Sequence, residues 1–129
     1  MTTTTYYNLK KPAGTDFYDV ADQNGNMDII DAALHEIASD AGEHYLKQLN
    51  SAVAVASWSE SSYEAWPYKA DITFTGCTAD YVCDVMFSPA QVALGIFAPI
   101  AEASAGKVTI YAEEVPSAAI TIPVIELRK

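Results

Sequence analysis

The sequence predicts an α+β protein, in which an N-terminal coiled-coil helix precedes a small antiparallel β domain and the whole chain forms a homotrimer. Three observations predict this fold. Apolar residues recur at alternating spacings of three and four between positions 27 and 41. Short segments after residue 68 alternate apolar and polar side chains, as half-buried strands do. One helix start, Ser88-Pro89, interrupts those segments.

Residues 1–15 are expected to form an extended N-terminal arm, because Pro12 and Gly14 interrupt regular structure. A helical trimerisation segment is expected over residues 16–49. Its first part, positions 16 to 43, carries acidic side chains and no Lys or Arg. Asp19 and Asp22 suit the start of a helix, because short acidic side chains accept hydrogen bonds from free backbone N–H groups there.

The apolar spacing in this helix forms a narrow seam, which is typical of a coiled coil rather than of a helix lying on a globular core. With Leu34 at an a position and Ile30 and Ile37 at d positions, the pattern favours three or four strands over two, and we expect three. The alternative is a helix that folds back on the β domain of its own chain. The expected trimer interface consists of Met27, Ile30, Leu34, Ile37 and Ala41.

Residues 50–129 are expected to form a small β-rich domain with one helix, in the order strand, strand, helix, strand, strand, preceded over residues 50–62 by a connector or a first strand. The segments Lys69–Thr75 and Tyr81–Phe87 alternate cleanly and are candidates for a hairpin. The helix that begins at Ser88-Pro89 is expected to kink or end at Pro99.

Two further strands are expected to close the chain. Gly106 precedes the first, Val108–Ala112, and the second is Ile120–Leu127. Pro123 is expected to confine the second strand to an edge, or to stand where no ladder hydrogen bond is donated. A charge at Leu127 in this terminal strand is expected to be tolerated better than a charge at Leu34 in the helical seam, where symmetry would repeat the charge three times at close range.

The charge balance excludes several classes of partner. Seven Lys and Arg residues stand against seventeen Asp and Glu residues, a formal net charge of −10. Such a surface repels nucleic acid and anionic lipid, so we expect neither nucleic acid nor membrane as a partner. The absence of a long apolar run and of a signal-peptide pattern in MTTTTYYNLKK predicts synthesis in the cytoplasm.

No pattern in the sequence predicts a catalytic, metal or cofactor site. The segment DQNGNMDIID resembles a calcium loop at its start, but Met27 stands where the turn needs glycine, and Ala33 where a glutamate should ligate. His35 and His44 project to opposite sides of a helix and cannot share a ligand. Cys77 and Cys83 are expected to be packing residues, with a disulfide as the alternative.

An aromatic cluster between positions 58 and 68 is the one candidate for ligand recognition. Aromatic rings on a serine-rich background are typical of sugar-binding sites and of protein interfaces, although core packing of Trp58 and Trp66 is the competing interpretation. Tyr63 is expected to be exposed, and Trp66, directly before the first clear strand, to be packed. The candidate ligand contacts are Tyr63 and Trp58.

The N-terminal run YNLKKPAGTDFYDVADQNGNMDIIDAALHEI resembles the opening of structural proteins from tailed phages and prophages of Gram-positive bacteria. Met27 and Gly25 depart from that pattern, which usually has Phe and Glu at these positions. The matching positions are Pro12, Asp16, Phe17, Tyr18, Asn24, Asn26, Asp28, Ile30, Asp31 and Leu34.

A second resemblance covers the C-terminal part, which is similar to a small domain of phage tail-fibre and baseplate-associated proteins. It rests on Trp66-Pro67-Tyr68, Gly76, Asp84-Val85, the run GKVTIYAEEVP and the closing IPVIEL, with Val115-Pro116 in place of the usual Lys-Pro.

Together the resemblances imply a non-enzymatic virion protein, a fibre-like homotrimer of the tail or baseplate that acts in assembly and host attachment. The implied partners are other virion proteins and a glycan or protein of the host surface, and the implied location is the virion. The alternatives are a head fibre or capsid decoration protein and, as a more distant one, a small glycan-degrading enzyme.

Overall fold

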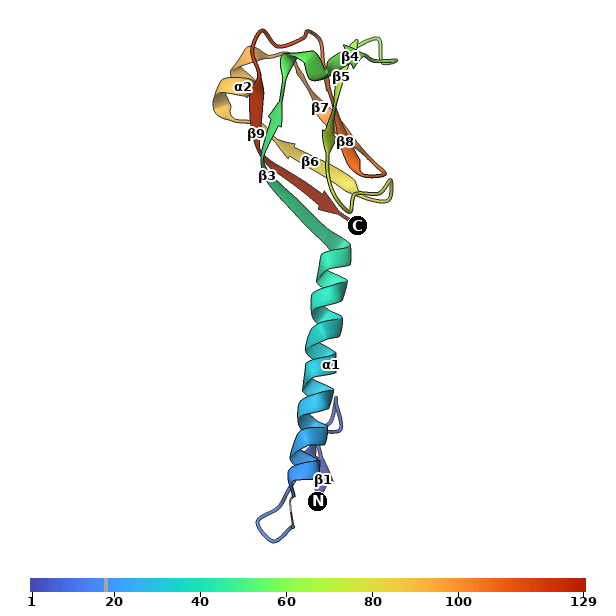
Figure 1. Cartoon of the computed structure of the whole chain (residues 1–129), viewed down its shortest axis with the longest axis vertical. Coiled ribbons are helices and arrows are strands. Elements are labelled where there is room, and N and C mark those ends of the chain that lie inside the picture. The colour runs from blue at the N-terminus through green and yellow to red at the C-terminus, as the bar shows by residue number, and fades with distance from the viewer. Residues whose placement is uncertain (18) are drawn as a thin grey trace. The chain divides into compact units, whose positions relative to one another are not determined.

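The computed structural model describes residues 1–17 and 19–129 (Figure 1). It divides into two compact units, Met1–Gly42 and Glu43–Lys129. One long helix is followed by antiparallel sheets, which confirms the α+β class. The coiled coil and the trimer concern contacts between chains and stay predictions. Tyr18, one of the positions in the N-terminal resemblance, lies outside the described residues.

Helix α1 spans Val20–His44, and the structure buries none of its residues. The helix starts where the acidic pattern predicts, with the Asp22 N–H donating to Asp19 Oδ1 at 2.9 Å. The expected helical end at residue 49 is wrong, because strand β3, Tyr45–Val53, begins directly after α1. Pairing of residues 45–49 with the last strand of the chain supplies their backbone hydrogen bonds instead.

The N-terminal arm contains a small hairpin, which corrects the expectation of an extended segment without regular structure. Strands β1, Thr2–Thr3, and β2, Lys10–Lys11, pair antiparallel. The side-chain amide of Asn26 in α1 then acts as an additional strand partner for Lys10. Its Oδ1 accepts from the Lys10 N–H at 2.7 Å, and its Nδ2 donates to the Lys10 carbonyl at 3.0 Å. This pair of hydrogen bonds ties the hairpin to the helix.

The second unit contains two antiparallel sheets. One has the strand order β3-β9-β6, and the other β4-β5-β8-β7. The remaining elements are η1 (Val55–Ser57), β4 (Trp58–Glu60), β5 (Tyr68–Thr73), β6 (Val82–Met86), α2 (Pro89–Leu94), β7 (Phe97–Ser104), β8 (Lys107–Ala112) and β9 (Ile120–Arg128).

The expected order of two strands, a helix and two strands is therefore incomplete, and the expected hairpin is wrong. Strands β3, β4 and β7 add to the set, and β5 and β6 lie in different sheets. Strand β5 pairs with β4 and β8, while β6 pairs with β9 from the far end of the chain. Hairpin patterns report alternation within a segment and carry no information on distant partners.

Helix α2 begins at the predicted position. The Ser88 hydroxyl accepts from the Gln91 N–H at 3.3 Å, and the Gln91 side chain accepts from the Ser88 N–H at 2.9 Å, which is a capping box. Gly95, with φ of 68°, ends the helix, so Pro99 does not end it and lies in β7.

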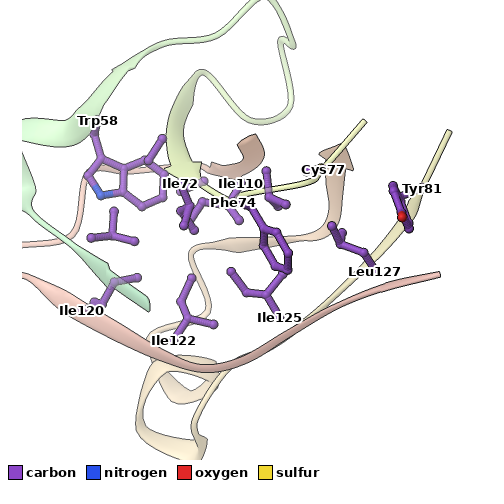
Figure 2. Close-up of a cluster of buried hydrophobic side chains, with 14 residues drawn as sticks. Trp58, Ile72, Phe74, Cys77, Tyr81, Ile110, Ile120, Ile122, Ile125 and Leu127 are labelled. Atoms are coloured by element: carbon purple, nitrogen blue, oxygen red, sulfur yellow. The ribbon is translucent and has the colours of Figure 1, made fainter. Parts of the chain in front are cut away.

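The core lies between the inner faces of the two sheets (Figure 2). Figure 2 shows the apolar side chains of β9 directed toward Ile72 and Phe74 of the other sheet and its adjoining turn. Leu127 is fully buried, which corrects the expectation that a charge would be tolerated there. The innermost side chains are Val108, Ile110, Ile122, Ile125 and Leu127.

Strand β9 is the central strand of its sheet, so Pro123 does not confine it to an edge. Pro123 instead occupies a gap in the β3 ladder between the pairs Leu49–Val124 and Ser51–Ile122. Opposite it stands Asn50, which has a positive φ of 52°. The ladder with β6 stops at Val124, so no backbone donor is required at residue 123 on either side.

Candidate functional site

Helix α1 leaves its apolar seam uncovered in the structure. Met27, Leu34 and Ile37 are 58%, 61% and 60% exposed, and Ile30 is 40% exposed. Ala41 is also exposed. Full burial of one such large side chain contributes about 1.5–3 kcal/mol, so the seam holds a substantial driving force for association.

The arm lies beside this seam within the same unit. Tyr7 lines a shallow hollow together with Glu36, Ile37 and Asp40 of the helix. The hollow places an aromatic ring of the arm next to one of the expected interface residues. The seam therefore has an aromatic neighbour at Ile37, where the sequence alone predicts only a bare helix.

Trp58, predicted as a candidate ligand contact, belongs to the core, and this corrects that assignment. It is 9% exposed, and its ring centroid lies 6.1 Å from that of Phe97. Phe97 in turn stacks on Phe87 at 4.6 Å. Trp66, expected to be packed, is only half-buried. Register with Ala70 of β5 directs Trp58 inward, and a short sequence segment does not reveal that register.

Tyr63, the other candidate ligand contact, is 41% exposed and lies in the loop between β4 and β5. Its ring meets the edge of Tyr111 at a centroid distance of 5.0 Å and an interplanar angle of 78°. Both hydroxyls donate to the Glu102 carboxylate, with Tyr111 at 2.9 Å. We call Tyr63, Glu102 and Tyr111 the Tyr63 cluster.

Sequence reasoning missed Glu102 and Tyr111, which lie on β7 and β8. The pattern of β8 indicates a strand, but nothing local to it indicates which loop covers its outer face. Only the pairing of β5, β7 and β8 brings the cluster together.

Hydrogen bonding determines the ionisation of the cluster. The Tyr63 hydroxyl, and then that of Tyr111, hold the pKa of Glu102 below its ordinary value. Burial, and then the bond to Glu102, raise the pKa of Tyr111. Nearby on the same sheet face, hydrogen bonds from Lys107 and Thr109 lower the pKa of Asp71. Glu102 and Asp71 are therefore carboxylates at neutral pH and do not suit the role of a general acid.

We expect the β domain to lose stability in acid partly through these two carboxylates. A group whose pKa is lower in the folded than in the unfolded chain stabilises the fold above its unfolded pKa. That contribution disappears as the pH falls from the ordinary values, 4.5 for Glu102 and 3.8 for Asp71, through the lower folded values. Melting curves between pH 2 and 7 should show a shallower acid dependence for Glu102→Gln than for the parent chain. Equal slopes for both would contradict the prediction.

The calcium-like segment and the adjacent glutamates are the other polar features that the sequence singles out. The calcium-like segment is helical, where Asp22 pairs with Lys10 and Asn26 binds the Lys10 backbone. Glu113 and Glu114 follow β8 in a bend. Over residues 1–17 and 19–129, no group of three or more His, Cys, Asp and Glu side chains is placed to hold a metal ion.

Both cysteines are free thiols. Burial raises the pKa of Cys77 and raises that of Cys83 to about 11. The thiolate is the reactive form, so both side chains are poor nucleophiles at neutral pH. Their arrangement fits the packing role that was expected for them.

Comparison of the chain with protein-family models, curated proteins and solved structures gives no match. In the part of the chain that the structure describes, no helix combines the length and the hydrophobicity needed to cross a membrane.

Proposed function

We propose that this chain is a non-enzymatic structural protein of a phage or prophage particle, a fibre-like homotrimer that acts in assembly and host attachment at the tail or baseplate. The single observation that carries the proposal is the exposed seam of α1. A helix of 25 residues that buries none of them gains little stability from its own chain. Covering the seam with two further copies supplies the missing burial.

Two features support the proposal beyond the seam. The resemblance to phage structural proteins includes Asn26, and in the structure Asn26 attaches the arm hairpin to the helix. The β domain carries an exposed aromatic, Tyr63, held by two neighbours of other strands. The proposed partners are a second and third copy, other virion proteins, and a host-surface glycan or protein.

The proposed mechanism of attachment is avidity. Three copies of a weak site on one assembly raise the effective concentration for the second and third contacts, so that modest affinity per site is enough. The attachment function thus depends on the oligomer.

A mass measurement in solution tests the oligomer directly. Light scattering at micromolar protein concentration should give about three times the chain mass of 13.9 kDa. A single peak at the mass of one chain would overturn the trimer and favour a helix folded back on its own β domain.

Electron microscopy of labelled phage particles tests the place in the virion. Antibody against the chain should mark the tail or baseplate. Label on the capsid would instead identify a head fibre or decoration protein. Release of glycan fragments from host cell wall by the purified chain would identify an enzyme.

Substitution of Tyr63 tests the proposed contact with the host surface. Tyr63→Ala should weaken adhesion to host cells and lower the melting temperature only modestly, because the side chain is 41% exposed and lies outside the core, although it contacts Tyr111 and Glu102. Val55→Ala, at another residue that is 41% exposed, is the matched control. Equal adhesion by Tyr63→Ala and the parent would remove Tyr63 from the proposal.

A further inference from the structure

The outer face of the β3-β9-β6 sheet exposes several large apolar side chains. Side chains of these strands alternate between the core and this outer face, and the three strands lie side by side (Figure 1). Leu49, Val82 and Met86 are 56%, 74% and 43% exposed, and Tyr45 is 43% exposed. Val124, between Leu49 and Met86 in the register, is half-buried.

These residues form two rows that cross all three strands. The pairing places Leu49, Val124 and Met86 in one row, and Tyr45, Arg128 and Val82 in another. The row of Leu49, Val124 and Met86 is apolar across all three strands and forms a continuous patch, whereas single exposed apolar residues scattered on a surface need no explanation. The other row has apolar or aromatic side chains at both edges and Arg128 between them.

The row between these two holds Lys47, Glu126 and Asp84, and Arg128 of the neighbouring row completes the balance of charge. Arg128 Nη2 donates to Asp84 Oδ2 at 2.8 Å and to Glu126 Oε2 at 3.3 Å. The Tyr45 hydroxyl donates to Glu126 Oε1 at 2.8 Å, and Lys47 pairs in register with Glu126. Two cations and two acids cancel on this face, while the whole chain carries −10. Two copies can therefore approach through this face without the repulsion that the chain's net charge implies elsewhere.

The strand that begins this face follows the helical seam directly in the chain. Strand β3 begins at Tyr45, the residue after α1 ends, and only four residues after Ala41 of the seam. A span of four residues is at most about 14 Å. Where three seams meet, the starts of three β3 strands must lie near one another.

We propose that the outer face of the β3-β9-β6 sheet contacts the β domain of a second copy of this chain and continues the interface formed by the helices. The proposal rests on the trimer proposed above. Its occupant is a second copy because the charges of the face cancel, one row is apolar across all three strands, and β3 follows directly in the chain after the helix that brings copies together.

Methionine oxidation tests the two proposals separately in the full chain. The chain has three methionines, of which Met1, Met27 and Met86 are 49%, 58% and 43% exposed in a single copy. Met1 is the exposed control, Met27 reports the seam, and Met86 reports the sheet face. Dilute peroxide oxidises exposed thioethers. Peptide mass spectrometry gives the oxidation rate of each methionine, and the chain unfolded in guanidinium provides the reference rate.

For a trimer by mass, we expect Met27 and Met86 to react at least about fivefold more slowly than Met1. If Met27 is oxidised slowly but Met86 is oxidised as fast as Met1, the sheet contact is overturned and the helical trimer is retained. A chain of monomeric mass in which Met86 is oxidised slowly would overturn both the trimer and the sheet contact, because residues of the same chain would then cover Met86.

A charge on the face provides a second test. Leu49→Lys should raise the protein concentration at which half of the trimer dissociates by about tenfold, because three lysines would replace apolar contacts between copies. Val92→Lys, at an exposed apolar residue of α2, is the matched control and should leave the midpoint nearly unchanged. Equal midpoints for the two variants would overturn the proposal.

Discussion

Leu34→Asp is expected to convert the trimer into single chains. Leu34 is 61% exposed in one copy, so the substitution costs that copy little. In the assembled seam, however, three carboxylates would meet in a dry interface. An unpaired buried charge costs several kcal/mol, about 3–5 per chain, and symmetry repeats that cost in each copy. Sedimentation at fixed protein concentration should therefore show the mass of one chain.

Ser39→Asp is the matched control, because it adds the same charge to the same helix on the side away from the seam. It should remain trimeric. If Leu34→Asp also remains trimeric with unchanged melting, the β domain drives assembly. Leu127→Asp is not a suitable control, although the sequence predicts that a charge there is tolerated. Leu127 is fully buried, and its replacement by aspartate should unfold the domain.

Trp58→Ala is expected to lower the free energy of unfolding by about 3–5 kcal/mol. The indole lies in the core against Phe97, and its removal leaves a cavity between the two sheets. Trp66→Ala should cost clearly less, because that ring is half-buried. Chemical denaturation of both variants at one protein concentration measures the difference.

Trp58→Phe separates loss of volume from loss of polar contacts. The Trp58 Nε1 is buried and has no hydrogen-bond partner among the described residues, so phenylalanine removes a buried donor as well as part of the ring. Its cost should fall well below that of Trp58→Ala. A greater loss from Trp66→Ala than from Trp58→Ala would contradict the assignment of the core.

Features specified by neighbouring residues could be predicted from the sequence. The capping pair Ser88 and Gln91 and the proline at position 89 determine the start of α2, because their hydrogen bonds are local. The alternation in β6 predicts its buried face, where Cys83 and Val85 lie inward and Val82 and Met86 outward. The apolar seam and the exposure of Tyr63 were also visible in the sequence.

Features that depend on distant segments could not be predicted. Residues 45–49 follow α1 and are expected from the sequence to be helical, but pairing with β9 makes them a strand. The Tyr63 cluster needs Glu102, from a strand 39 residues away in the chain. The arm hairpin is attached to α1 through Asn26, whose side chain bonds the Lys10 backbone from 16 residues away in the chain.

The amino-acid sequence by itself determined the long helix with its apolar seam, the capped α2 and the faces of individual strands, because periodicity and capping act within one or two turns or a few residues of a strand. The tertiary structure alone decided which strands pair, that Trp58 is core, and which acid holds Tyr63. Strand pairing joins segments far apart in the chain, and a single strand's alternation is compatible with many partners. The choice among them is made by simultaneous burial of both sheets against one core.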